Sequence, residues 1–119
     1  MKTYQELFEG TLWGVMQWNQ WDELRGRLAA GADTWYVYAL GHDVPEAPIS
    51  GSKLEVILNE MDTMLRKDHK EKYLGIVYAD DLASPTLIKV YDPNNLGASC
   101  GSSGRKIYPG WVLSRMQPE

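Results

Sequence analysis

One segment constrains the fold of this chain more than any other, because its apolar residues recur three and four positions apart over several helical turns. Ser52 and Glu55 have the spacing of a capping box at its start. Arg66, Lys67 and Lys70 place positive charge near its end, where it complements the helix dipole. The segment therefore predicts a helix that buries one face. That face consists of Leu54, Ile57, Leu58, Met61 and Leu65, with Met64 beside it.

Short segments of strand-like composition make up much of the remaining chain, and turn residues bound them. They are residues 11–18, 34–40, 73–79, 86–91 and 111–116. Residues 73–79 and 86–91 flank a six-residue connection, which predicts an antiparallel hairpin. Residues 34–40 are apolar on both faces, which is typical of an interior strand. Gly75 marks a bulge or a close approach of two backbones.

Capping signals predict two further helices. Thr3 and Glu6 have capping-box spacing, and Gly10 follows as a stop signal, so a short helix is expected between them. Asn19 is expected to cap a second helix over residues 20–30, which carries acids in its first turn and arginines later.

The order of these elements places consecutive strands in the second half of the chain, without helices between them. This order predicts an α+β fold: a mainly antiparallel sheet of about five strands with two helices packed on one face. The length is close to the commonest domain size, and 44% of the residues are hydrophobic. We therefore expect residues 1–119 to form a single globular domain.

Aromatic residues are more numerous than a core of this size easily conceals, with five tryptophans and seven tyrosines in the chain. Two modest helices can cover one face of the sheet, so its other apolar face needs a second cover. A second copy of the chain would supply that cover through a two-fold interface. The sequence therefore predicts a homodimer.

Charge and cysteine content limit the compartment and the partners. The formal net charge of −4 disfavours nonspecific binding to nucleic acid or acidic lipid. A single cysteine cannot form an internal disulfide, which fits a reducing compartment. The first ten residues lack the apolar run of a signal peptide, and no stretch of the sequence is apolar enough to span a bilayer. We expect a soluble, cytoplasmic protein with neither a nucleic-acid nor a membrane partner.

The most unusual segment is the glycine- and serine-rich loop over residues 92–106, which holds the single cysteine. Consecutive amides in such a loop can form an anion-binding nest, and two basic residues at its end can lower the pKa of a nearby thiol. A strand rather than a helix is expected to follow the loop, which excludes a Walker-type nucleotide site. The candidate ligand-binding residues are Cys100, Gly101, Ser102, Ser103, Arg105 and Lys106.

Two functions are compatible with this loop. The leading hypothesis is a non-catalytic accessory or binding domain that presents residues 92–106 to a protein or a small anionic ligand. The alternative is a small cysteine-dependent enzyme or redox protein, in which Cys100 is the nucleophile and the loop amides are oxyanion donors. His42 or His69 would then serve as the base. Rapid labelling of the native thiol by iodoacetamide near pH ~6.5 would favour the enzyme.

Acids and histidines occur in adjacent pairs, such as Asp68-His69 and Asp80-Asp81, rather than at the spacing of a metal motif. The simplest interpretation places the first pair at a helix end and the second in a turn. We therefore predict neither a metal site nor a cofactor.

Overall fold

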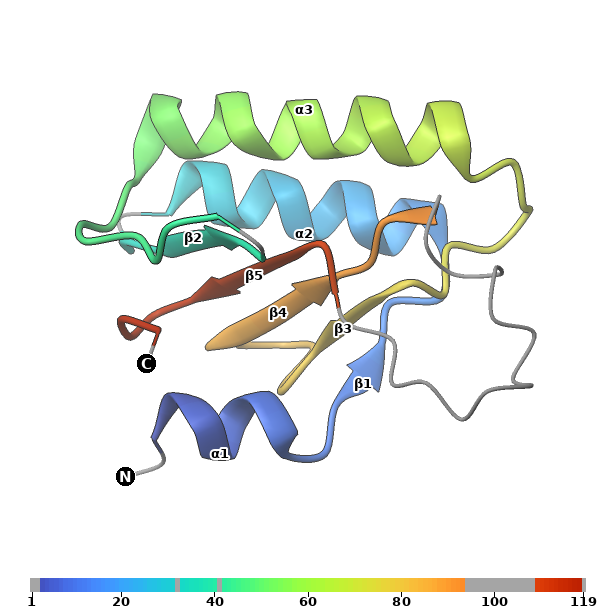
Figure 1. Ribbon diagram of the computed structural model, residues 1–119. Coiled ribbons are helices and arrows are strands. Elements are labelled where there is room, and N and C mark those ends of the chain that lie inside the picture. Colours follow the sequence, from blue (N-terminus) through green and yellow to red (C-terminus); the bar gives the residue numbers. More distant parts are fainter. Residues whose placement is uncertain (1–2, 32, 41, 94–108, 119) are drawn as a thin grey trace.

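The computed structural model describes residues 3–31, 33–40, 42–93 and 109–118, and over these ranges it confirms the predicted α+β fold (Figure 1). Helices and strands follow one another in the predicted order. They are α1 (Tyr4–Glu9), β1 (Trp13–Gly14), α2 (Trp18–Ala30), β2 (Tyr36–Ala39), α3 (Gly51–Asp68), β3 (Val77–Ala79), β4 (Leu87–Val90) and β5 (Trp111–Ser114). Within the same ranges, no helix combines the length and the apolar character that crossing a membrane requires.

The strands form one antiparallel sheet in the order β1-β3-β4-β5-β2. The hairpin between β3 and β4 is confirmed, with Tyr78 opposite Lys89. Because side chains alternate between the two faces of a strand, the register also fixes which side chains share a face. One such row runs across the sheet through Val37, Leu113 and Ile88.

Helices cover this sheet from both sides: α2 and α3 lie together on one face, and the shorter α1 lies on the other (Figure 1). The predicted apolar face of α3 is confirmed, since it packs into the main core between the helices and the sheet. The buried residues that the two long helices contribute are Trp21, Leu24 and Leu28 from α2, and Leu54, Leu58, Met61 and Leu65 from α3.

α1 covers part of the second face, and its capping box is present as predicted. The Glu6 amide donates to Thr3 Oγ1 at 3.1 Å, and the Thr3 amide donates to Glu6 Oε1 at 3.0 Å. Tyr4 packs with Leu87 and Val112 in a small second core. Burial, with the neighbouring Tyr38, raises the pKa of Tyr4 to about 12. The chain therefore supplies from within itself a cover that the sequence analysis assigned to another subunit.

The prediction that residues 34–40 form an interior strand was wrong, because β2 is the last strand of the sheet beyond β5. Its residues are half-buried on both faces. They are apolar on both sides because α3 lies over one face and α1 over the other, and not because strands flank both edges. Apolar residues on both faces of a strand indicate that layers pack above and below it. They do not indicate whether strands pair with both of its edges.

Two helix starts differ from the prediction. α2 begins at Trp18, and the Gln17 amide donates to the side chain of Gln20 at 2.9 Å, so Asn19 lies in the first turn rather than at the cap. α3 begins one residue before Ser52, and that serine is therefore inside the helix.

The strand predicted over residues 11–18 contains only two residues in β1, and Trp18 belongs to α2. Backbone pairing nevertheless continues beyond β1. The Val15 amide donates to the Val77 carbonyl at 2.7 Å, and the Gly75 amide donates to the Val15 carbonyl at 3.1 Å. Gly75 has a φ of 67°, which favours glycine. The predicted close approach of two backbones at this glycine is confirmed.

Candidate binding cleft

The predicted ligand-binding residues lie outside the residues that the structure describes. These residues are Cys100, Gly101, Ser102, Ser103, Arg105 and Lys106. The loop hypothesis and the cysteine hypothesis therefore stay predictions, and the candidate site has to be found among the described residues.

The two histidines lie in different surroundings. The ring Nε2 of His69 lies 2.8 Å from the Leu74 carbonyl and 3.1 Å from the Tyr73 carbonyl, and the ring also contacts Trp18. His69 thus holds the loop that follows α3 against the start of α2. The backbone amide of His42 donates to the Ala39 carbonyl at 3.0 Å, which closes a turn after β2.

The adjacent acids Asp80 and Asp81 organise the connection between β3 and β4. The Asp80 carboxylate accepts the amides of Thr86 and Leu87 at 2.7 and 3.0 Å. The Asp81 carboxylate accepts the amides of residues 83 and 84. The two carboxylates thus accept backbone amides that water would otherwise bind, and the pair lies in a turn as predicted from the sequence.

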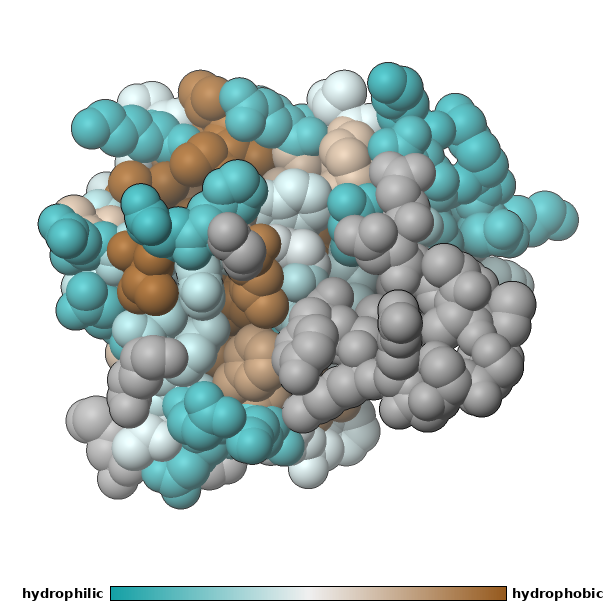
Figure 2. All heavy atoms as spheres, in the orientation of Figure 1, coloured by the Kyte–Doolittle hydropathy of each residue, from teal (hydrophilic) through white to brown (hydrophobic). Residues whose placement is uncertain are grey.

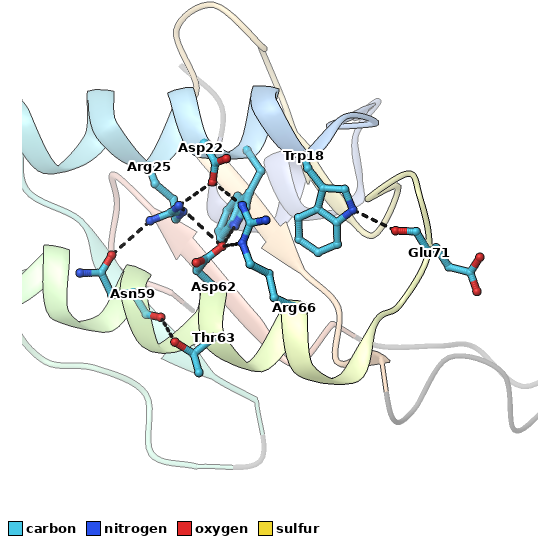
Figure 3. A network of polar contacts seen from close by, with 9 residues as sticks. Trp18, Asp22, Arg25, Asn59, Asp62, Thr63, Arg66 and Glu71 are labelled. Carbon is cyan, nitrogen blue, oxygen red and sulfur yellow. Dashed lines mark hydrogen bonds and ion pairs between the residues drawn. The ribbon is translucent and has the colours of Figure 1, made fainter.

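Polar side chains also join α2 to α3 on their outer surfaces (Figure 3). Asp22 accepts from both Arg25 and Arg66, each at 2.6 Å. Asp62 accepts from Arg66 at 2.8 Å and from the buried indole of Trp21 at 2.9 Å. The two acids balance the two arginines, so this network is neutral, and most of its donors and acceptors are directed at one another. The buried Arg25 Nε is the exception, since it has no hydrogen-bond partner among the described residues. We assign the network to the docking of the helices.

The electrostatics of the network follow from these contacts. Burial alone would raise the pKa of Asp22, but the hydrogen bonds from Arg25 and Arg66 outweigh it and hold the pKa below its usual value. Arg66 also lies over the Trp18 ring, 4.8 Å from its centroid. Among the described residues, no three His, Cys, Asp or Glu side chains gather closely enough to hold a metal ion.

A hollow of about 340 Å³ lies between α2 and the β3–β4 connection. Its polar lining residues are Gln20, Glu23 and Arg27. Arg27 donates to the carbonyls of Leu82 and Ala83 at 3.1 and 2.8 Å. The guanidinium therefore fastens the connection to α2 instead of facing a ligand.

A second hollow, which we call the edge cleft, has a different lining. It measures about 380 Å³ and lies between the outer edge of β2, the segment before α3, and α3 itself. Figure 2 shows hydrophobic residues on the left of this view, below α3 and over the region of β2. The volume and the apolar lining are typical of small-ligand pockets. The lining residues are Val37, Ala39, Pro45, Ala47, Ile49, Ile57, Glu60 and Trp111.

The edge cleft exists because the segment before α3 pairs at one point with the residue that precedes β2 and then diverges. Trp35 and Ile49 exchange two hydrogen bonds of 2.8 Å. Two prolines, Pro45 and Pro48, remove amide donors from this segment. The ladder stops after a single bridge, and the space beside the next part of β2 stays open.

The backbone of Val37 faces this open space. Peptide groups two residues apart in a strand point to the same edge, so Val37 and Ala39 point outward like Trp35. The Ala39 carbonyl is taken by the turn amide of His42. Within the described ranges, no hydrogen bond reaches the outward peptide group of Val37. Among the described residues, the edge of β2 beside the cleft thus offers two amide donors, those of Val37 and Ala39, and one carbonyl acceptor, that of Val37.

Glu60 gives the edge cleft its charge. Among the described lining residues it is the one with a formal charge, and no described side chain pairs with its carboxylate. The positions three and four residues away on α3 are Val56, Ile57, Thr63 and Met64, so the helix itself offers no cation. The cleft is therefore apolar, with a net negative rim.

Sequence reasoning missed this site because it placed residues 34–40 inside the sheet. The available signals were Pro45 and Pro48, which prevent a strand from covering the far side of β2. No protein-family model, curated protein or solved structure matches the chain.

Proposed function

We propose that this protein is a non-catalytic binding domain that takes an apolar ligand in the edge cleft. One observation carries the proposal: an apolar hollow of about 380 Å³ lies along an open strand edge and contains a partly buried tryptophan, Trp111. Ligand pockets of this size combine apolar walls with a few polar groups that orient the ligand. Here those groups are the Val37 peptide and the Glu60 carboxylate.

The roles of the other polar clusters support a binding function. The carboxylates of Asp80 and Asp81 accept backbone amides, and those of Asp22 and Asp62 hold two helices together. His69 is engaged with two backbone carbonyls. Each of these groups has a task in maintaining the fold, whereas the edge cleft has polar groups that remain open to a ligand.

The proposal is tested with isopentanol, a small neutral apolar probe, titrated into ¹⁵N-labelled protein and followed by amide chemical shifts. We expect saturable shifts at Val37, Ala39 and Ala47. Ala47→Phe places a ring in the cleft from an exposed loop position and should abolish them. Ala30→Phe, at the exposed end of α2, is the matched control and should bind normally. Shifts that are absent, or that survive Ala47→Phe, would overturn the proposal.

Homodimer formation is a second proposal, supported by the part of the sheet beyond α1. Gly14, opposite Tyr78, lies in the row of the sheet that includes Lys89, which contacts Phe8 of α1. Met16 packs beside Gly14 and is 50% exposed. This uncovered surface is where a second copy would dock.

Light scattering at tens of micromolar should therefore give twice the mass of the chain. Met16→Lys should yield a monomer, because a charge at this position has to be desolvated in the interface. Val56→Lys, at an exposed position on the outside of α3, should remain dimeric. A monomeric wild type would end the dimer proposal. Presentation of residues 92–106 to a partner, and a cytoplasmic location, also stay proposals.

A further inference from the structure

We infer that the ligand of the edge cleft is the N-terminal residue of a peptide with an apolar side chain. This inference rests on the proposed function, because it assigns a chemical class to the ligand of the same cleft. It combines three properties of the lining: the open peptide group of Val37, the carboxylate of Glu60, and the apolar walls.

Val37 is the one outward-facing residue of β2 whose amide and carbonyl are both open among the described residues. On one side the Trp35–Ile49 bridge occupies the edge, and on the other the turn amide of His42 occupies the Ala39 carbonyl. Among the residues whose peptide groups point outward, only Val37 lies between them. An opposing residue in an antiparallel pair exchanges two hydrogen bonds, one from each amide to the other carbonyl. A ligand that matches Val37 therefore needs an N–H donor and a carbonyl acceptor on the same residue, placed as they are in an opposing antiparallel strand.

The charge of the rim selects among ligands of that kind. Glu60 has no cationic partner among the described residues, so a ligand that brings a positive charge is favoured over a neutral or anionic one. An α-ammonium group has three donors. One can reach the Val37 carbonyl while the charge faces the Glu60 carboxylate, and the carbonyl of the same ligand residue can accept from the Val37 amide.

The walls of the cleft specify the side chain. Val37, Ile49 and Ile57 are partly buried and pack against the main core, as does Trp111. A hydrocarbon side chain that fills the space between them removes apolar surface from water at about 25 cal/mol per Å². An acidic or strongly polar uncharged side chain would lose hydration between these apolar walls without gaining a partner.

Leucinamide carries all three features, and simpler probes remove them one at a time. N-acetylleucinamide lacks the charge, isopentylamine lacks the carbonyl, and isopentanol lacks both. The titrations are performed near pH ~6, below the usual α-amino pKa of about 7.7–8.0. Amide shifts of Val37 report binding. We expect leucinamide to bind about tenfold more tightly than isopentanol, from one charge pair and two hydrogen bonds.

Glu60→Gln tests the charge pair directly. It should weaken leucinamide binding about fivefold, the upper range for a solvent-exposed ion pair, and leave N-acetylleucinamide binding unchanged. Glu55→Gln removes an equal charge from an exposed position of α3 outside the cleft and is the matched control. It should leave both affinities as they are.

The two proposals fail in different ways. If isopentanol binds in the cleft but leucinamide binds no more tightly, the N-terminal residue is the wrong ligand class and the apolar site remains. Equal losses in Glu60→Gln and Glu55→Gln would likewise overturn the inference, because they would indicate a general effect of net charge. If none of the probes shifts the Val37 amide, the proposed function itself falls.

Discussion

At the scale of single residues, two glycines show how the same residue type serves opposite purposes. Gly75 has a φ of 67° and brings its amide to the Val15 carbonyl. Gly26 lies inside α2, and a Cβ added there would meet no atom within 4 Å. Gly75 is needed because its backbone has a positive φ, whereas Gly26 meets no such need and lowers the helix propensity of α2.

Replacing each by alanine should therefore change stability in opposite directions. Gly75→Ala should lower the free energy of unfolding by about 1–2 kcal/mol, since an L-residue is strained in the left-handed region. Gly26→Ala should raise it by about 0.8–1.0 kcal/mol through helix propensity. Urea denaturation measures both. A change of the same sign in the two variants would contradict this account of the backbone.

At the scale of elements, α2 and α3 are joined by side chains whose charge depends on pH. Asp22 is held by Arg25 and Arg66, and its pKa lies below the usual value. A carboxylate whose pKa is lower in the folded state stabilises that state above the unfolded pKa, about 3.9. That contribution is lost as the pH falls through the lower, folded pKa.

Asp22→Asn should therefore destabilise the protein at pH ~7, and the destabilisation should shrink between pH ~7 and pH ~2 as the wild-type carboxyl takes up its proton. The loss at neutral pH should stay below about 1 kcal/mol, because Asp22 is exposed. Glu23→Gln, at the next position, is the control, since no described residue pairs with it. Urea unfolding at both pH values measures the difference, and a constant destabilisation across pH would rule out this assignment.

Elements were also the scale at which the sequence was most informative. The helical spacing of Leu54, Leu58 and Leu65 predicted α3 and its buried face, because that spacing repeats over several turns. The spacing of Thr3 and Glu6 predicted the cap of α1. The starts of α2 and α3 were less accurate, since polar residues able to cap a helix occur at several adjacent positions.

At the scale of the whole molecule, the neighbours of a strand were not predictable from its own residues. The segment around Tyr36 and Tyr38 is apolar on both faces whether it lies inside the sheet or at its edge, as long as layers cover it above and below. Its true place depends on pairing with β5, which is remote in sequence. The edge cleft follows from that placement and could not be predicted without it.

The loop site over residues 92–106 was easy to notice in the sequence, but its geometry could not be inferred from it. Its glycines and the cysteine Cys100 stood out in composition, but composition does not specify which atoms converge. The edge cleft has an ordinary composition, and its significance comes from the position of Val37, Glu60 and Trp111 around one hollow.

The central claim is that an apolar ligand binds in this hollow, and intermolecular nuclear Overhauser effects test it most directly. Protein with labelled methyl groups is mixed with isopentanol, and contacts between probe protons and protein methyls are measured. We predict contacts to the methyls of Val37, Ala47 and Ile57, which line the edge cleft. Contacts confined to Leu24 and Leu82, which line the hollow beside α2, would contradict the claim.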